Sequence, residues 1–234
     1  MRIIARLSPI LLVPVLLAQP AFAASDPRPR LNGVRVGHSS SPTGRIVTAH
    51  NYAVRVERGL VPGRRTYGVS EVPIVMQDQQ DPVWCVPAST RAVLSAFIKN
   101  LPSQAYLAML EGTGQYGTYL DRVPTVLNHY QSRIKYEVRN TKNFTEYREQ
   151  VRTDVDVYRA PLILAIDPAR APWYLSMNLR SGNHAIVANG YTFMPRFGGI
   201  VIWDPSGLPE AGVHIVDVLK LWAAAAPLGA PVVW

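Results

Sequence analysis

The 234-residue sequence predicts an α+β fold in which a helical N-terminal half packs on a mostly antiparallel sheet. The order of its segments supports this class. Segments with apolar residues at helical spacing come first in the body of the chain, and short apolar runs typical of strands follow them. The composition, 48% hydrophobic and 17% charged, is that of a globular protein and excludes a disordered chain.

The expected elements cover most of the second half of the sequence. Helices are predicted where apolar residues recur every three or four positions, over residues 86–100, 103–110, 121–129, 143–158 and 217–225. Strands are predicted for short apolar or alternating runs, over residues 134–138, 161–167, 184–191 and 200–203. Pro87 and Ser103 support the first two helices, because proline is tolerated in a first turn and serine is a good N-cap.

Residues 1–23 have the pattern of a secretory signal peptide. Arg2 and Arg6 precede a mostly apolar stretch at 10–18, and the small residues Ala21 and Ala23 stand where a signal peptidase would cut. We therefore expect an exported protein, either secreted or periplasmic. The sequence has no run of twenty apolar residues, so no membrane span is expected in the mature chain.

Residues 24–70 form a basic N-terminal extension that precedes a neutral domain at 71–234. The extension has a net charge of +6, from Asp26, Glu57 and eight arginines: Arg28, Arg30, Arg35, Arg45, Arg55, Arg58, Arg64 and Arg65. It could be a pro-segment, a linker or a contact for an anionic surface, and its composition favours a solvated arm. One short strand is expected in it, at 54–57. Aromatic residues do not interleave with the arginines, so nucleic-acid binding is not expected.

Cys85 is the single cysteine, which excludes an intramolecular disulfide and a cysteine-rich zinc site. No metal-binding or phosphate-binding motif is present either, so no cofactor is expected. Cys85 stands where a loop becomes a helix, and the helix N-terminus stabilises a thiolate by about 0.3–1 kcal/mol. A free thiol needs more than this at neutral pH, so a nucleophilic Cys85 requires a nearby histidine. The alternative is a small buried apolar residue.

Two further residues have the chemistry to assist Cys85. His184 opens an apolar strand after a Ser-Gly-Asn turn, although it could equally be a hydrogen-bonded core histidine. Asp204 ends the next strand at a Pro-Ser-Gly turn, where its carboxylate could accept the second ring N–H of His184. The alternative for Asp204 is ordinary turn chemistry.

The ordered set Gln79, Cys85, His184 and Asp204 resembles the papain-like cysteine peptidases, specifically the C39-like group of bacterial proteins. In that family a glutamine precedes by six residues a cysteine that opens a helix, a histidine then opens an apolar strand, and an Asp-Pro ends the next strand. The resemblance covers roughly residues 72–225. Val86 departs from the family, which often has glycine after the cysteine.

The resemblance implies a papain-like fold and a role for each residue. Cys85 would be the nucleophile, His184 the base and acid, and Asp204 the residue that orients His184. The Gln79 amide and the Cys85 backbone N–H would bind the oxyanion. Gln77 and Gln80 are nearby alternatives, and only the six-residue spacing to Cys85 favours Gln79.

We therefore expect an exported thiol hydrolase, a peptidase or amidase, acting on a peptide or protein substrate. The alternatives are a non-catalytic binding protein of the same fold and an acyltransferase with transglutaminase-like chemistry. Family members fused to transporters cleave leader peptides after paired glycines inside the cell. Because this chain is expected to be exported, we do not expect it to share that substrate.

Overall fold

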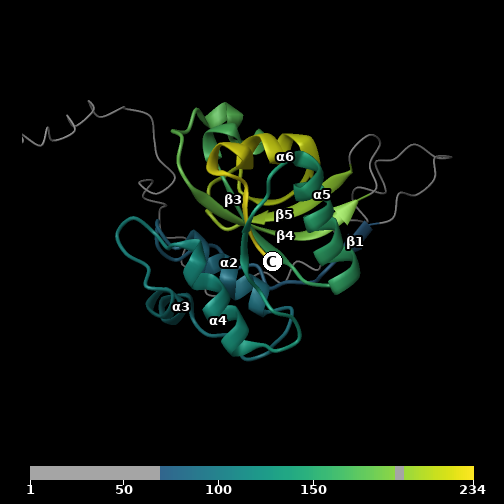
Figure 1. Ribbon diagram of the computed structural model, residues 1–234. Helices are drawn as coiled ribbons and strands as arrows, with labels where there is room; N and C mark the ends of the chain where they lie inside the picture. Colours follow the sequence, from purple (N-terminus) through teal and green to yellow (C-terminus); the bar gives the residue numbers. More distant parts are fainter. Residues whose placement is uncertain (1–68, 193–197) are drawn as a thin grey trace, which may run out of the picture.

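One antiparallel sheet runs through the part of the protein that the computed structural model describes, residues 69–192 and 198–234 (Figure 1). Its strands are β1 (Val69–Glu71), β2 (Val138–Asn140), β3 (Leu162–Ile166), β4 (His184–Thr192), β5 (Gly199–Asp204), β6 (Gly212–Asp217) and β7 (Pro231–Val233). The strands lie in the order β2-β7-β3-β4-β5-β6, and β1 pairs with the far end of β4. Every pair is antiparallel.

Helices cover both faces of this sheet (Figure 1). On one face lie α2 (Cys85–Leu94), α3 (Gln104–Leu110) and α4 (Val123–Tyr130), and on the other lie α5 (Phe144–Arg152) and α6 (Val218–Ala225). The side chains of β3 alternate between the two cores, with Leu162 and Leu164 facing α5 and α6 and Ile163 facing α2. The central strands are therefore buried on both faces, which explains their continuous apolar sequences.

The sheet brings the start of β4 and the end of β5 to the same place. Val187 of β4 lies opposite Trp203 of β5, so His184 and Asp204 emerge at one end of the sheet. Helix α2 packs against β4 near this end, where the Ser89 hydroxyl donates to the carbonyl oxygen of Ala185. The N-terminus of α2 therefore reaches the strand ends that carry His184 and Asp204.

The structure confirms the α+β class, with a helical N-terminal half packed on an antiparallel sheet. The helix predicted at 103–110 forms, and the Ser103 hydroxyl accepts the backbone N–H of Tyr106 as predicted for an N-cap. The helix predicted at 86–100 ends at Leu94, because Ala96 N–H bonds to Val93 and tightens the following turn. The helix predicted at 143–158 begins as α5 and continues as a π-helix over Thr153–Tyr158.

The strand predicted at 134–138 is misplaced, and three strands, β1, β6 and β7, were not predicted. Residues 134–137 are not part of a strand, because the Asn128 side chain bonds both backbone groups of Tyr136 and takes the place of a neighbouring strand. Strand β2 begins only at Val138. Neither β6 nor β7 was predicted, and β7 has three residues, too few to show a period.

The predicted signal peptide at 1–23 lies outside the described residues, as does the basic extension up to residue 68 with its expected strand at 54–57. The last two residues of the extension belong to β1, which pairs Val69 with Thr192 and Glu71 with Gly190. Within residues 69–192 and 198–234, no helix is both long and apolar enough to cross a membrane.

Candidate active site

Cys85 is the first residue of α2, as the sequence predicts, and its side chain is buried. The preceding residue, Trp84, provides no side-chain cap, and Pro87 has no backbone N–H. The backbone N–H groups of Cys85 and Val86 therefore stand at the positive end of the helix without a capping side chain. This arrangement favours negative charge on the sulfur and on any oxygen held beside it.

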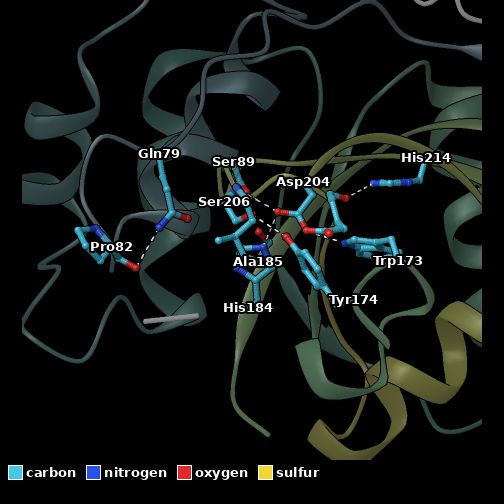
Figure 2. A network of polar contacts seen from close by, with 12 residues as sticks. Gln79, Pro82, Ser89, Trp173, Tyr174, His184, Ala185, Asp204, Ser206 and His214 are labelled. Carbon is cyan, nitrogen blue, oxygen red and sulfur yellow. Dashed lines mark hydrogen bonds and ion pairs between the residues drawn. The ribbon is translucent and has the colours of Figure 1, made fainter. Parts of the chain in front are cut away.

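The Gln79 side chain closes the turn that leads into α2 (Figure 2). Its amide nitrogen donates to the carbonyl oxygens of Asp81, at 3.0 Å, and Pro82, at 2.9 Å. The Asp81 carboxylate accepts the backbone N–H of Val83 at 3.0 Å, so residues 81–84 form a fixed turn. The two amide protons of the predicted oxyanion donor are thus engaged by this 81–84 turn, and an oxyanion would have to compete for one of them.

His184 and Asp204 form a buried pair. The His184 Nε2 lies 2.8 Å from Asp204 Oδ1, and both side chains are fully buried. Since an ionised carboxylate only accepts hydrogen bonds, Nε2 carries the proton in this pair. The other ring nitrogen, Nδ1, is buried and has no hydrogen-bond partner among the described residues. Nδ1 is therefore the atom free to take a proton from Cys85.

The surroundings of His184 favour its charged form. Burial works to lower the pKa of the ring, but the Asp204 carboxylate and the Cys85 sulfur oppose burial and raise the pKa above its usual value. Cys85 stands at the start of α2, the helix end that reaches the strand end carrying His184, so the sulfur and the ring belong to the same region. A protonated ring beside a sulfur is the condition that the sequence alone required for a nucleophilic cysteine.

Asp204 is held by several donors at once (Figure 2). Its Oδ1 also accepts the backbone N–H of Ser206 at 2.9 Å, and its Oδ2 accepts the indole N–H of Trp173 at 2.9 Å. Burial would raise the pKa of Asp204, but His184, the Ser206 N–H and the Tyr174 hydroxyl hold it below its usual value. The carboxylate is therefore ionised and fixed in orientation.

Backbone contacts join the segment that precedes α2 to the turn that follows Asp204. The Gln79 N–H donates to the carbonyl oxygen of Pro205 at 2.7 Å, directly after Asp204. The next glycine, Gly207, has a φ of +70° and a side chain there would lie against Asp78. The structure therefore brings the four predicted residues, Gln79, Cys85, His184 and Asp204, into one region.

Sequence reasoning missed residues that support Asp204 from the side. Trp173 and Tyr174 lie in a 3-10 helix, Pro172–Met177, for which the sequence offered no signal. His214 stacks on Trp173, with ring centroids 5.1 Å apart and an interplanar angle of 16°. Burial lowers the pKa of His214, and the Glu210 carbonyl oxygen and Asp204 oppose that effect. The apolar alternation of β6 could have placed His214 on a strand.

The two neighbouring glutamines lie differently from Gln79. The Gln77 side chain contacts Gln104, and Gln80 is exposed. Neither donates to the 81–84 turn. In the part of the chain that the structure describes, no three His, Cys, Asp or Glu side chains gather closely enough to hold a metal ion.

Comparison with known proteins gives a family match that spans the site. The model of the Peptidase_C39 like family matches residues 69–226. The chain is similar to the peptidase domain of Streptococcus ComA, a bi-functional ABC transporter involved in a quorum sensing pathway, with 19% identity and a TM-score of 0.44 over 67% of this chain and 93% of that one. It is also similar to UfSP from C. elegans, with 17% identity and a TM-score of 0.46 over 88% of this chain and 41% of that one. No curated protein matches the sequence.

Proposed function

We propose that this chain, which belongs to the Peptidase_C39 like family and is a cysteine-type peptidase, cleaves its substrate through Cys85, His184 and Asp204. The family implies a peptide or protein substrate. The observation that carries the assignment is the His184 ring, which Asp204 holds through Nε2 and whose buried Nδ1 has no hydrogen-bond partner among the described residues.

The geometry supports a two-step reaction. In the first step, Cys85 transfers its proton to His184 Nδ1, and the sulfur attacks the carbonyl carbon of the scissile amide. The C–N bond then breaks, the leaving amine takes the proton from His184, and a thioester remains on Cys85. In the second step, water gives a proton to His184 and attacks the thioester, which releases a carboxylic acid and the free thiol.

The negative oxygen formed in each step needs hydrogen-bond donors. The backbone N–H of Cys85 lies at the uncapped start of α2 and is one such donor. The Gln79 amide is the second, once it exchanges its bond to Asp81 or Pro82 for one to the oxyanion. The amide stays attached to the 81–84 turn during this exchange, because one of its two N–H groups remains hydrogen-bonded to a carbonyl oxygen.

The test is the reactivity of Cys85 toward iodoacetamide, followed by mass spectrometry across pH 4–9. A thiolate paired with protonated His184 is alkylated at acidic pH, and His184→Ala slows this alkylation by an order of magnitude or more. Cys85→Ala removes the alkylated site, and His129→Ala, a histidine on α4, is the matched control. If His184→Ala leaves the alkylation rate unchanged, the chain is a binding protein that keeps the fold. Amide transfer to an added amine, measured by product analysis, would indicate an acyltransferase.

We also propose that the protein is exported, since residues 1–23 have the three parts of a signal peptide. Expression of the full chain in a bacterial host, followed by fractionation and N-terminal sequencing, tests this. The expected mature protein starts near Ala24 and is found in the periplasm or the medium. A product in the cytoplasm that retains residue 1 would contradict the proposal. A product that starts near residue 69 would identify 24–68 as a removed pro-segment.

A further inference from the structure

Gln104, the first residue of α3, is a buried polar side chain outside the predicted catalytic set. Only 1% of its surface is exposed. Its amide nitrogen donates to the carbonyl oxygens of Asp78, at 2.9 Å, and Gln77, at 3.2 Å. Its amide oxygen accepts the backbone N–H of Gln80 at 2.9 Å. A single side chain therefore bonds the backbone on both sides of Gln79, in the manner of a neighbouring strand.

These bonds are the start of a continuous path to the nucleophile. Gln104 fixes the backbone at 77–80, and the Gln79 side chain that projects from this segment donates to Asp81 and Pro82. The Asp81 carbonyl oxygen in turn accepts the N–H of Trp84, the residue before Cys85. On the other side, the Gln79 N–H is bonded to Pro205. Two amide side chains in series thus link α3 to the start of α2.

We propose that Gln104 is a positioning residue for the oxyanion site: it sets the direction of the Gln79 amide and, through the 81–84 turn, of the Cys85 backbone N–H. This inference rests on the proposed function, because it assigns an oxyanion role to Gln79 and to Cys85 N–H. It concerns only donors that stabilise a negative oxygen. The interaction of Cys85 with His184 involves different atoms and does not depend on Gln104.

The chemistry of the contact requires an amide. Methionine has a similar length and would fill the space, but it would leave the carbonyl oxygens of Gln77 and Asp78 and the N–H of Gln80 without their partner. Glutamate would keep the acceptor for Gln80 and, only when protonated, one donor for Asp78. The two substitutions therefore distinguish the loss of the whole contact from the loss of its donors.

Gln131 provides a matched control. It lies at the end of α4, is 7% exposed, and clamps a loop in the same way, with its amide nitrogen on Ile134 and its amide oxygen on the N–H groups of Arg133 and Ile134. It lines a surface hollow with residues 96–98, just beyond the end of α2 opposite to Cys85. Gln131→Met thus costs comparable backbone contacts at a distance from the site.

The experiment compares two reactions of Cys85 in the full-length protein. Hydrolysis of p-nitrophenyl acetate passes through an oxyanion, whereas alkylation by iodoacetamide does not. Gln104→Met is expected to lower the kcat of ester hydrolysis by about tenfold or more and to leave KM within about twofold, since small displacements of positioned groups cost that much. Alkylation by iodoacetamide stays near the wild-type rate, and Gln131→Met changes neither reaction.

A double variant separates positioning from a general effect on folding. If Gln104 acts through Gln79, Gln79→Ala/Gln104→Met is no slower than Gln79→Ala alone. If Gln104→Met does not fold, Gln104→Glu provides the same test: its ester activity relative to wild type rises as the pH falls and the carboxyl group regains a donor. The inference is overturned if Gln104→Met is as active as Gln131→Met, if the effects of Gln79→Ala and Gln104→Met multiply, or if Gln104→Glu shows no relative gain at low pH. Slow alkylation of wild-type Cys85, equal to that of His184→Ala, would instead refute the proposed function.

Discussion

The two sides of the site are built by different means. On the sheet side, His184 and Asp204 stand at the ends of buried strands, and the register of β4 with β5 sets their spacing. On the helical side, Gln79 precedes a turn and Cys85 follows it, and side-chain amides hold this segment in place. The sheet side thus depends on backbone pairing, and the helical side depends on a few polar side chains.

This difference matches the task of each side. A carboxylate and an imidazole must keep one hydrogen bond fixed throughout the reaction, and paired strands provide this. The oxyanion donors must instead accept a new oxygen in each step, so a segment whose amide can exchange one bond is suited to it. Variants on the sheet side should therefore change the charge of the His184–Cys85 pair, whereas variants on the helical side should change only steps that form an oxyanion.

Asp204→Asn should have the largest effect and would test the sheet side directly. Both carboxylate oxygens accept N–H donors, from His184 and Ser206 on one and Trp173 on the other. An asparagine must therefore turn its NH₂ group against a donor. We expect kcat for ester hydrolysis to fall by about 10²–10⁴-fold, as wrong-tautomer variants of triads do.

The same variant should alter the pH dependence of Cys85. The Asp204 carboxylate raises the pKa of His184, so its removal lowers that pKa and the charged ring is lost at lower pH. The alkylation profile should shift accordingly. Asp217→Asn is the control, because Asp217 caps α6 and asparagine is an equally good cap. A kcat within tenfold of wild type would contradict the orienting role of Asp204.

Gln79→Ala should have the next largest effect and would test the helical side. Loss of one oxyanion donor typically lowers kcat by about 10²–10³-fold. Alkylation of Cys85 by iodoacetamide should stay close to the wild-type rate, because no oxyanion forms in that reaction. Gln80→Ala is the control, since the exposed side chain of Gln80 is next in the sequence and only its backbone is bonded to Gln104. Equal activities of the two variants would remove Gln79 from the site.

On the helical side, the buried carboxyl group of Glu111 should make the stability of the fold depend on pH. It follows α3 on the helical side, is 1% exposed, and its carboxylate oxygens have no hydrogen-bond partner within the described ranges. Burial raises its pKa to about 7, although the Thr90 hydroxyl opposes this. Since the folded protein binds this proton more tightly than the unfolded chain, stability is greatest below the unfolded pKa and falls as the pH rises toward 7.

Glu111→Gln should remove that loss. At pH 8 we expect the variant to be more stable than wild type by about 2–3 kcal/mol, and at pH 4 the two should be equal. Urea unfolding at both pH values measures the difference. Glu137→Gln removes an exposed ion pair with Arg139 and is the control, with an expected change in stability of no more than about 1 kcal/mol. A variant that is less stable than wild type at pH 8 would show that Glu111 is stabilised as a carboxylate.

The sequence predicted the three reactive residues better than the side chains that hold them in place. His184 and Asp204 each border an apolar run, and Cys85 is the only thiol, so local patterns made all three candidates, and the family resemblance then assigned their roles. Gln79 was identified only through the family resemblance. The roles of Gln104 and Trp173 could not be predicted, because each depends on contact with a segment at least 24 residues away. Asn128 shows the same limit, since its side chain replaces a strand that local alternation predicted.

Trp173→Phe should have the smallest effect and would measure how far the sheet side tolerates the loss of one donor. Phenylalanine keeps a ring for His214 to stack on and removes only the N–H bonded to Asp204 Oδ2. A hydrogen bond to a charged group contributes about 1.5–3 kcal/mol. The Tyr174 hydroxyl still acts on the carboxylate, so we expect kcat to fall only by about tenfold, at the low end of that range. Trp222→Phe on α6, where Trp222 packs against Tyr147 of α5, should leave kcat unchanged. If the two tryptophan variants have the same kcat, the indole N–H does not help to orient Asp204, and β4–β5 pairing with the Ser206 N–H is sufficient.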